Sequence, residues 1–523
     1  MTYDNSGGFM KDFKDEFKRL DWPILIVPAA IIFVMCVFFF SMPKETTNFI
    51  SSLKPFFRDK MSLVYLFVSF ALFLIAIYLS FSKYGNIVLG QKDEKPAFSF
   101  WGWGAMMFCC GMAADILYYG FSEWLFYSQE PYIISMSAKS VSGNPFDFSN
   151  VYSFFFWANF WEYLVIGTCF AFMMHVRNRS KQKYSEAIRP LIGKHADGVI
   201  GKIIDVFATM AIIAAVACSL SFTVPVITTC LNSLFGVPNT HFTTIVILIL
   251  ICVIYSISLA NGLKGIKFLS SICIYVFLVF ILYVFLLGGK AQYILESTFK
   301  QVGLLFDNIF VIFTDINPAR TESEFVQNYS VFYNAFWLTW AITVPFFIGV
   351  ISKGRTIRQT ILGGLAFAMP GSVLCFSVLS NYSESLQVFN TMDLIYIYNN
   401  GGFDAYAVIK EIVGSLPFPQ IALLILIVSM ICFNATSFDS ISLTCSYYSY
   451  KNLSNDETPH YVIKQFWAIL LILLPIALIF SEGTAANFQD VAVIFGFPGA
   501  ILVTLVVISF FKDLDKYQKE MEK

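Results

Sequence analysis

Residues 332–358 read FYNAFWLTWAITVPFFIGVISKGRTIR. An apolar run of about 20 residues ends there at a basic turn that contains Lys353, Arg355 and Arg358. A helix of that length matches the roughly 30 Å hydrocarbon core of a bilayer. Lys and Arg beyond the end of such a run are typical of the cytoplasmic side. This stretch therefore predicts a membrane-spanning helix with a cytoplasmic basic anchor.

Similar apolar runs recur along all 523 residues of the chain, which is 57% hydrophobic and only 13% charged. Soluble domains carry about 25% charged residues. We therefore predict an all-α polytopic membrane protein embedded in a lipid bilayer. Its twelve transmembrane helices are expected near residues 24–42, 63–82, 100–127, 151–174, 199–231, 242–260, 266–288, 331–350, 358–382, 417–444, 462–481 and 488–511.

The distribution of Lys and Arg predicts that both termini are cytoplasmic, because most of the 34 basic residues then fall in cytoplasmic segments. The first outer loop breaks this trend with Lys44, Lys54, Arg58 and Lys60. Two longer segments lie between spans. Residues 290–313 have the pattern of an amphipathic helix on the outer surface, and residues 384–414 are expected to form a second surface segment.

Composition also argues against other classes of protein. A net charge of −1 gives no electrostatic support for nucleic-acid binding. The eleven cysteines are scattered without a C-x-x-C motif, and none of the four histidines lies in the middle of an apolar run. We therefore predict that the protein has no metal site and no cofactor, and that it is not an enzyme. A channel, the alternative from a different class, would normally have pore-lining repeats or a filter sequence, and neither is evident.

The first functional candidate is Gly111-Met112-Ala113-Ala114-Asp115, inside the third span. Small residues weaken a helix, and unwound backbone at membrane depth is tolerated only where it lines a cavity or is covered by protein. An intramembrane Asp is costly and marks a functional site by default. The alternative is that Asp115 is a structural carboxylate satisfied by a neighbouring hydroxyl or amide.

The second candidate is a set of aromatic residues on two spans. They are Phe156, Trp157, Phe160, Trp161 and Tyr163 on the fourth span, and Phe336, Trp337 and Trp340 on the eighth. A quaternary ammonium group donates no hydrogen bond and is held by the faces of aromatic rings. Packing is the competing explanation, because 18% of the chain is aromatic. Trp337 and Trp340 share one helix face and lie inside their span, which favours a substrate box.

The third candidate is Thr436-Ser437-Phe438-Asp439-Ser440 in the tenth span. Adjacent hydroxyl groups in an apolar helix can bind a hard cation such as sodium, but they also cap their own backbone carbonyls. Glu162 is a further charge beside the aromatic residues of the fourth span. It either faces the cavity as a counter-ion or pairs with a basic partner.

These motifs together resemble the betaine/choline/carnitine transporter family. Residues 332–358 are similar to its signature eighth helix, with an aromatic set followed by a basic I-S-x-G-R-T-I-R turn. The stretch AMMFCCGMAADILYYGFSEW, residues 105–124, resembles the family's glycine stretch followed by Gly-x-x-Glu. The sequence NATSFDS, residues 434–440, is similar to its T-S-x-D-S motif. The matches fall in order and, with the twelve spans, cover most of the chain.

The resemblance implies a LeuT-like fold of two inverted five-helix repeats. The expected organisation is a cytoplasmic N-terminus at 1–23, two extra helices at 24–99, a first repeat at 100–288, an outer amphipathic helix and linker at 289–330, a second repeat at 331–511 and a cytoplasmic tail at 512–523. Family members are trimers, with the outer amphipathic helix contributing to the contact. A bacterial inner membrane is the expected location.

The resemblance also implies roles for individual residues. Trp337 is the central box tryptophan and Trp340 lines the outer path, whereas Phe336 replaces a tryptophan of the usual pair. The expected substrate-binding residues are Met112, Asp115, Trp157, Trp161, Tyr163, Phe336, Trp337 and Trp340. The fourth-span aromatics are about two residues closer together than the family pattern, so Phe160 competes with Trp161 for one box position. Thr436 and Ser437 match a sodium site, together with backbone carbonyls near Met112.

Asp115 bears on the choice between transport mechanisms. It ends the glycine stretch, in which Ala113 and Ala114 replace glycines, and an Asp there resembles proton-coupled choline transporters. Choline carries an uncompensated positive charge that needs a counter-charge in a low-dielectric cavity, and burial favours the neutral form of a carboxylic acid, so the group can exchange a proton. We predict a proton-coupled choline symporter that works by alternating access. A sodium-coupled glycine betaine symporter and a carnitine-type exchanger remain alternatives.

Overall fold

The computed structural model describes residues 16–112, 114–140, 143–179, 181–316, 324–453, 457–480 and 485–522. Ala113 and most of the predicted N-terminal segment lie outside the described residues. Apart from two isolated β-bridges, the described residues form helices and the connections between them.

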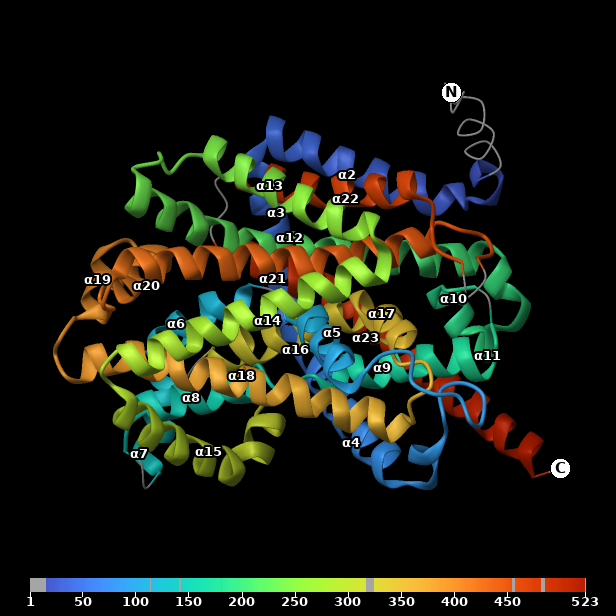
Figure 1. Cartoon of the computed structure of the whole chain (residues 1–523), viewed down its shortest axis with the longest axis horizontal. Helices are drawn as coiled ribbons and strands as arrows, with labels where there is room; N and C mark the ends of the chain where they lie inside the picture. The colour runs from blue at the N-terminus through green and yellow to red at the C-terminus, as the bar shows by residue number, and fades with distance from the viewer. Residues whose placement is uncertain are drawn as a thin grey trace, which may run out of the picture.

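The helices follow one another along the whole chain (Figure 1). In order, they are α2 (Trp22–Ser41), α3 (Pro43–Pro55), α4 (Ser62–Phe81), α5 (Phe100–Gly111), α6 (Asp115–Tyr127), α7 (Pro131–Lys139), α8 (Pro145–Phe156), α9 (Trp161–Ala171), α10 (Tyr184–Ala187), α11 (Arg189–Ile192), α12 (Val199–Phe235), α13 (His241–Ala260), α14 (Gly262–Leu287), α15 (Ala291–Thr314), α16 (Val331–Thr343), α17 (Pro345–Ile351), α18 (Ile357–Val388), α19 (Leu394–Asn400), α20 (Ala405–Gly414), α21 (Pro419–Tyr448), α22 (Tyr461–Phe480) and α23 (Ala485–Met521). Short 3₁₀ and π segments lie at Phe56–Lys60, Lys83–Asn86, Phe172–Val176, Gly193–Asp197 and Val326–Ser330.

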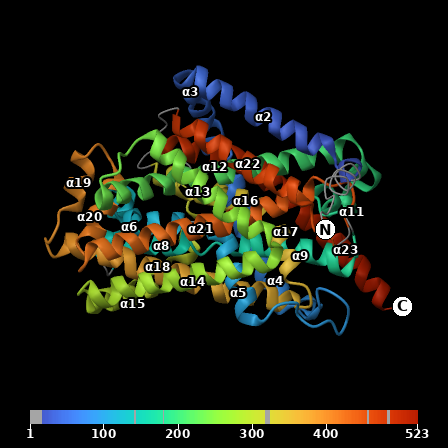
Figure 2. The same ribbon diagram turned by 45° about the horizontal axis from the view of Figure 1, so that its top comes forward.

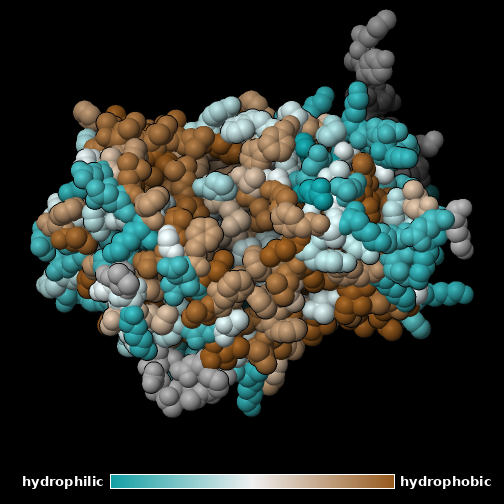
Figure 3. Space-filling model, turned by 90° about the horizontal axis from the view of Figure 1, so that it is seen from below, coloured by the Kyte–Doolittle hydropathy of each residue, from teal (hydrophilic) through white to brown (hydrophobic). Residues whose placement is uncertain are grey.

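Most of the long helices run between the two ends of the molecule, and α2 lies along the outside of the bundle against α22 (Figures 1 and 2). Hydrophobic side chains form a broad band across the face shown in Figure 3, between two hydrophilic ends. Exposed apolar side chains on α2, α4, α13 and α14 contribute to such a surface, for example Phe33, Phe67, Phe242 and Phe268. A surface of this kind suits a lipid environment, in which apolar side chains face outward.

Nine of the described helices are individually long and apolar enough to cross a membrane. Two further pairs pass the same test as bent spans, namely α5 with α6 and the helix Val326–Thr343 with α17. The fourth predicted span, 151–174, corresponds to α8 and α9, which contain 12 and 11 residues and are each shorter than a span. Every predicted span therefore has a helical counterpart, and the all-α membrane fold is confirmed. The division into two repeats and the proposed domain boundaries stay predictions.

The start of α2 and the end of α23 lie at the same end of the molecule, as an even number of crossings requires. Both contact the segment between α9 and α10. Lys183 in that segment pairs with Asp21 at the start of α2, at 2.5 Å. Arg177 pairs with Glu520 near the end of α23, at 2.7 Å. These ion pairs fix both ends of the described chain to one connection.

Two basic residues of the connection between α2 and α4, the predicted first outer loop, form ion pairs with other parts of the chain. Lys54 on α3 pairs at 2.6 Å with Asp490 of α23, whose side chain is buried. Arg58 contacts Glu324 at 3.1 Å, just before α16. These basic residues therefore neutralise local carboxylates, and the orientation of the chain stays a prediction.

The predicted amphipathic helix at 290–313 is α15, and one side of it packs on the protein through Ile294, Ser297 and Gln301. Gln301 is fully buried and exchanges hydrogen bonds of 2.8 and 3.1 Å with Asn381 of α18. The opposite face carries Phe299 and Phe306, which are 87% and 73% exposed. The exposed side of α15 therefore carries these rings together with the charged residues Glu296, Lys300 and Asp307.

Small residues allow neighbouring helices to approach the eighth span closely. A Cβ atom on Gly496 of α23 would lie 2.7 Å from Ala335 of α16. A Cβ atom on Gly167 of α9 would lie 2.5 Å from the side chain of Ile348 on α17. Such contacts are typical of helix packing in membranes, where small residues let backbones meet.

Candidate functional site

The third span is interrupted where the sequence predicted it. Helix α5 ends at Gly111, Met112 has extended backbone angles (φ −115°, ψ 108°), and α6 begins at Asp115. Ser437 of α21 donates its hydroxyl hydrogen towards the carbonyl oxygens of Cys109 at 3.2 Å and Met112 at 3.1 Å. Backbone groups at membrane depth need such partners, because lipid offers none. The break in this span is therefore tied to α21.

Asp115 is the first residue of α6 and is 1% exposed. Ser219 of α12 lies near the carboxyl group. Neither the Ser219 hydroxyl nor Asp115 Oδ1 makes a hydrogen bond with a described atom. Asp115 forms no ion pair with any residue in the described part of the chain. The positive end of the helix dipole partly supports its negative charge, and the oxygen without a partner leaves the carboxyl group available to a ligand.

The fourth span is interrupted as well, between the end of α8 at Phe156 and the start of α9 at Trp161. The indole Nε1 of Trp337 donates a hydrogen bond to the Phe156 carbonyl at 2.7 Å. This carbonyl lies at the end of α8, where a helix has no backbone N–H to offer it, so the indole supplies the hydrogen-bond donor. Trp337 is thereby fixed between the two halves of the span.

Trp337 is the centre of an aromatic group that also contains Trp157, Phe160, Tyr163, Phe336 and Trp340. Ring centroids lie 5.4 Å from Trp337 for Phe160, 6.0 Å for Tyr163, 6.2 Å for Trp157 and 6.2 Å for Phe336. Trp340 contacts Phe336 at 6.1 Å. Every ring of the group is at most 3% exposed.

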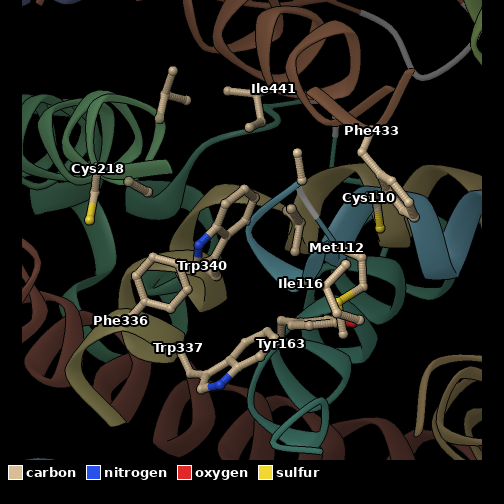
Figure 4. Packing of buried hydrophobic residues seen from close by; sticks show 14 of the residues in the cluster. Cys110, Met112, Ile116, Tyr163, Cys218, Phe336, Trp337, Trp340, Phe433 and Ile441 are labelled. Atoms are coloured by element: carbon tan, nitrogen blue, oxygen red, sulfur yellow. The ribbon is translucent and has the colours of Figure 1, made fainter. Parts of the chain in front are cut away.

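Figure 4 shows how these rings meet the broken third span. Phe336, Trp337 and Trp340 extend from α16, while Tyr163 lies on the side of Met112 and Ile116. Met112 belongs to the break itself. The structure therefore brings together Met112 and five of the predicted aromatic residues, with Asp115 three residues further along the same span.

Trp161 is the predicted substrate-binding residue that the structure does not bring to this group. Its ring packs on Phe73 of α4 at 5.1 Å and on Phe313 of α15 at 5.5 Å. Phe160, the competing candidate, lies beside Trp337. The sequence did not separate the two because the restart of the helix after Phe156 sets which side chain faces inward.

Glu162 and Thr436 also face away from the aromatic group. Glu162 is fully buried, and the hydroxyl of Ser69 on α4 donates to its Oε1 at 2.5 Å. Neither of the two expected roles is observed, because the described neighbour is a serine. Thr436 donates to the Phe433 carbonyl at 2.9 Å. Ser437 alone of the two adjacent hydroxyls therefore meets the break in the third span.

Sequence reasoning missed a second buried carboxylate on α6. Glu123 is fully buried and accepts hydrogen bonds from the hydroxyls of Tyr127, at 2.7 Å, and Tyr333. The signal was present, because Glu123 lies eight residues after Asp115 and so shares its helix face. It was read only as part of a motif.

The sequence model of the BCCT, betaine/carnitine/choline family transporter, matches residues 23–519. The chain belongs to this family. It is a secondary transporter of the betaine/carnitine/choline family, embedded in the membrane by many spans, and it is not an enzyme.

Several curated relatives share the length of this betaine/carnitine/choline family transporter. The glycine betaine transporter OpuD of Bacillus subtilis is 29% identical over 517 residues, which cover 96% of this chain and 95% of OpuD. A carnitine transporter of Acinetobacter baumannii is 28% identical, covering 86% of this chain and 80% of its own. An ectoine/hydroxyectoine transporter of Virgibacillus pantothenticus is 26% identical, covering 96% and 98%. Among solved structures, a substrate-bound, outward-open Na⁺-coupled sialic acid symporter matches 86% of each chain at 14% identity, with a TM-score of 0.43.

Proposed function

We propose that this transporter imports choline or a similar quaternary-ammonium cation by proton symport. The observation that carries the proposal is the Asp115 carboxyl group. It is buried at the broken third span, three residues after Met112, and has no basic partner in the described part of the chain. A carboxylate in that position costs free energy unless a cation or a proton neutralises it. A cationic substrate and a proton each meet that need.

The position of Asp115 also bears on the choice between cations and zwitterions. The exposed N-terminus of a half-helix normally attracts anionic groups, as in transporters whose broken helices bind a substrate carboxylate. Here the first residue of α6 supplies a negative charge of its own. Betaine and carnitine carry a carboxylate that would meet this charge. Choline carries none, so the local field favours it.

The aromatic group supports binding of the ammonium head. Rings attract a cation over their faces, by up to about 2 kcal/mol for a desolvated ring. We assign Trp337 as the central ring, with Trp157, Phe160 and Tyr163 beside it and with Phe336 and Trp340 extending towards one path. Met112 contributes its side chain from the break, and Trp161 is assigned to packing.

Coupling would then follow from two states of one carboxyl group. Protonated Asp115 is neutral and avoids the cost of burying a charge, whereas ionised Asp115 requires the substrate cation. Alternating access that allows the buried site to reorient only in a neutralised state would link substrate movement to the proton gradient. A proton is the only coupling ion in this scheme, and no other cofactor is needed.

Sodium coupling is the second candidate, and Ser437 favours it. Its hydroxyl oxygen and the carbonyl oxygens of Cys109 and Met112 converge within 3.2 Å, and oxygen ligands of this kind suit hard cations. A bound sodium ion would replace the hydroxyl hydrogen as the partner of these carbonyls. A substrate that carries its own carboxylate would fit this alternative better.

We further propose the assembly and placement that family membership suggests. Both ends of the described chain lie on the cytoplasmic side of a bacterial inner membrane. Three copies form a trimer to which the exposed apolar face of α15 contributes.

The test is uptake of labelled choline by the purified protein in liposomes, under an inward proton gradient, with and without sodium. The wild type is expected to concentrate choline without sodium, and Asp115→Gly is expected to lose this accumulation. Glu162→Gln is the matched control, because it removes the charge of another buried carboxyl group that faces α4. Uptake that requires sodium and survives Asp115→Gly would overturn the proton proposal.

A further inference from the structure

Helix α6 carries an acidic side chain followed four residues later by a tyrosine, and this pattern occurs twice. Asp115 is followed four residues later by Tyr119, and Glu123 is followed four residues later by Tyr127. Residues four apart lie on one helix face, and a rise of 1.5 Å per residue separates the two acids by about 12 Å. All four side chains are at most 4% exposed. We call these four residues the acid–tyrosine row.

The pair at the far end of the row is hydrogen-bonded. Tyr127 donates to Glu123 Oε1 at 2.7 Å, and Tyr333 of α16 donates to the same oxygen. Glu123 Oε2 has no hydrogen-bond partner among the described atoms, and Glu123 forms no ion pair with them. This end of α6 faces the outside in the predicted orientation. Glu123 is thus a buried proton-binding group on the outer side of Asp115.

Asp115 and Tyr119, the pair at the break, have the same spacing as Glu123 and Tyr127, but no hydrogen bond joins them. Side chains on a helix lean back towards its N-terminus, which brings Tyr119 to the side of α6 that carries Asp115. The Tyr119 hydroxyl, near Gln489 of α23, makes no hydrogen bond with a described atom. Tyr119 and Asp115 interact electrostatically, while Asp115 Oδ1 has no hydrogen-bond partner among the described atoms. The ring centroid of Tyr119 also lies 6.0 Å from that of Tyr333, whose hydroxyl donates to Glu123. Tyr119 therefore occupies the space between the two acids.

We propose that Glu123 is the outer proton station that loads Asp115, with the Tyr119 hydroxyl as the relay between them. This proposal rests on the proton symport proposed above. A proton from outside water binds the Glu123 carboxylate. It then passes to the Tyr119 oxygen, directly or through one water, as the hydroxyl hydrogen of Tyr119 moves to the Asp115 carboxylate. Glu123 is left ionised, Tyr119 is unchanged, and one proton has moved.

Such a relay explains how a proton can reach the buried Asp115 carboxyl group while the substrate is bound. The carboxyl group is buried, and an ammonium ion bound between it and the aromatic group would cover the direct approach. A second route along α6 lets the proton arrive independently of the substrate. The other titratable groups in electrostatic contact with the row are Tyr118, Cys218, Tyr329 and Tyr333. They are phenols and a thiol, so none of them supplies a fixed positive charge that would repel a proton.

The test compares two transport modes of the full-length protein in liposomes. Net uptake driven by a proton gradient requires protons to reach and leave Asp115. Counterflow, in which labelled choline exchanges with unlabelled choline inside, proceeds with the proton retained. Glu123→Gln and Tyr119→Phe are expected to lower proton-driven uptake at least tenfold while counterflow and choline binding stay within about twofold of wild type. Glu162→Gln is again the matched control and keeps both modes.

The outcomes separate this proposal from the one on which it rests. Proton-driven uptake that persists in Glu123→Gln and Tyr119→Phe, with a wild type that is itself proton-driven, would overturn the relay alone. Equal loss of counterflow and net uptake in both variants would also overturn it, because the two residues would then support the fold or substrate binding. A wild type that ignores the proton gradient would overturn the symport proposal and the relay together.

Discussion

Replacing Trp337 by leucine is expected to weaken choline binding about 30-fold. The substitution removes the ring at the centre of the aromatic group, whose neighbours lie 5.4–6.2 Å away. A desolvated cation–π contact is worth about 2 kcal/mol, and each 1.4 kcal/mol is about tenfold in affinity. Trp337→Phe keeps a ring face and loses only the indole donor, so its affinity is expected to fall less.

Both variants will also lose stability, because the Phe156 carbonyl loses its 2.7 Å hydrogen bond. A buried polar group left without a partner costs about 1–3 kcal/mol. The matched control is Trp467 on α22. It is equally buried, and its Nε1 donates to Ser449 Oγ at 2.7 Å. Trp467→Leu should therefore destabilise the protein similarly without touching the aromatic group.

The assay is equilibrium binding of labelled choline to detergent-purified protein, together with the melting temperature of each variant. We expect Trp337→Leu to weaken binding and lower the melting temperature, and Trp467→Leu to lower the melting temperature only. Unchanged affinity in Trp337→Leu would refute the assignment of Trp337 as the central ring. Equal losses of affinity in both leucine variants would show that the effect reflects stability.

Three further predictions follow from single contacts. Ser437→Ala is expected to slow choline uptake about tenfold, equally with and without sodium, because the carbonyls of the broken third span lose a donor worth about 1 kcal/mol or more. The control, Thr436→Ala, should have little effect on uptake. A loss of uptake confined to sodium-containing buffer would support sodium coupling instead. Lys54→Met should lower the melting temperature more than Asp490→Asn, because it leaves a buried carboxylate unpaired at a cost of up to about 3 kcal/mol; the reverse order would contradict the ion pair. Trp161→Phe should keep the KM for choline within about twofold of wild type, and a tenfold rise would place Trp161 in the substrate site after all.

Hydrophobic run length was enough to predict the membrane fold, because lipid imposes one requirement on every span. The positions of the helices followed from the apolar runs, and the break before Asp115 followed from small residues at membrane depth. The amphipathic pattern at 290–313 predicted α15. The sequence did not reveal that Gln301 is buried against Asn381 of α18, since the pattern does not say which neighbour the inner side of the helix meets.

The candidate site was predicted less completely. The side chains on α16 were assigned from their own helix, because α16 is regular from Val331 to Thr343. The assignment on the fourth span stayed open, because the chain leaves the helix after Phe156 and resumes it at Trp161. A periodic pattern cannot be extended across such a break. Trp161 and Glu162 therefore face α4, and Phe160 takes the inner position.

The three interrupted spans share a feature that links them to one another. Each break frees backbone carbonyls, and each set is bound by a side chain from a different element. Ser437 serves the break after α5, Trp337 serves the break after α8, and the Tyr184 hydroxyl donates to Ala341 at 3.2 Å and Ile342 at 3.0 Å near the end of α16. Each bond contributes only about 1 kcal/mol net, but the carbonyl left without it costs more.

A rearrangement at one break therefore displaces the donor of another. Trp337 lies on α16, so a change in the angle between α16 and α17 moves the indole that supports the fourth span. A substrate cation held against Trp337 acts on the same side chain. Binding at the aromatic group can thus shift α8 and α9 relative to α16 without any long-range change elsewhere. Because each bond is weak and its loss is costly, the site should exchange between a few fully bonded arrangements, as alternating access requires.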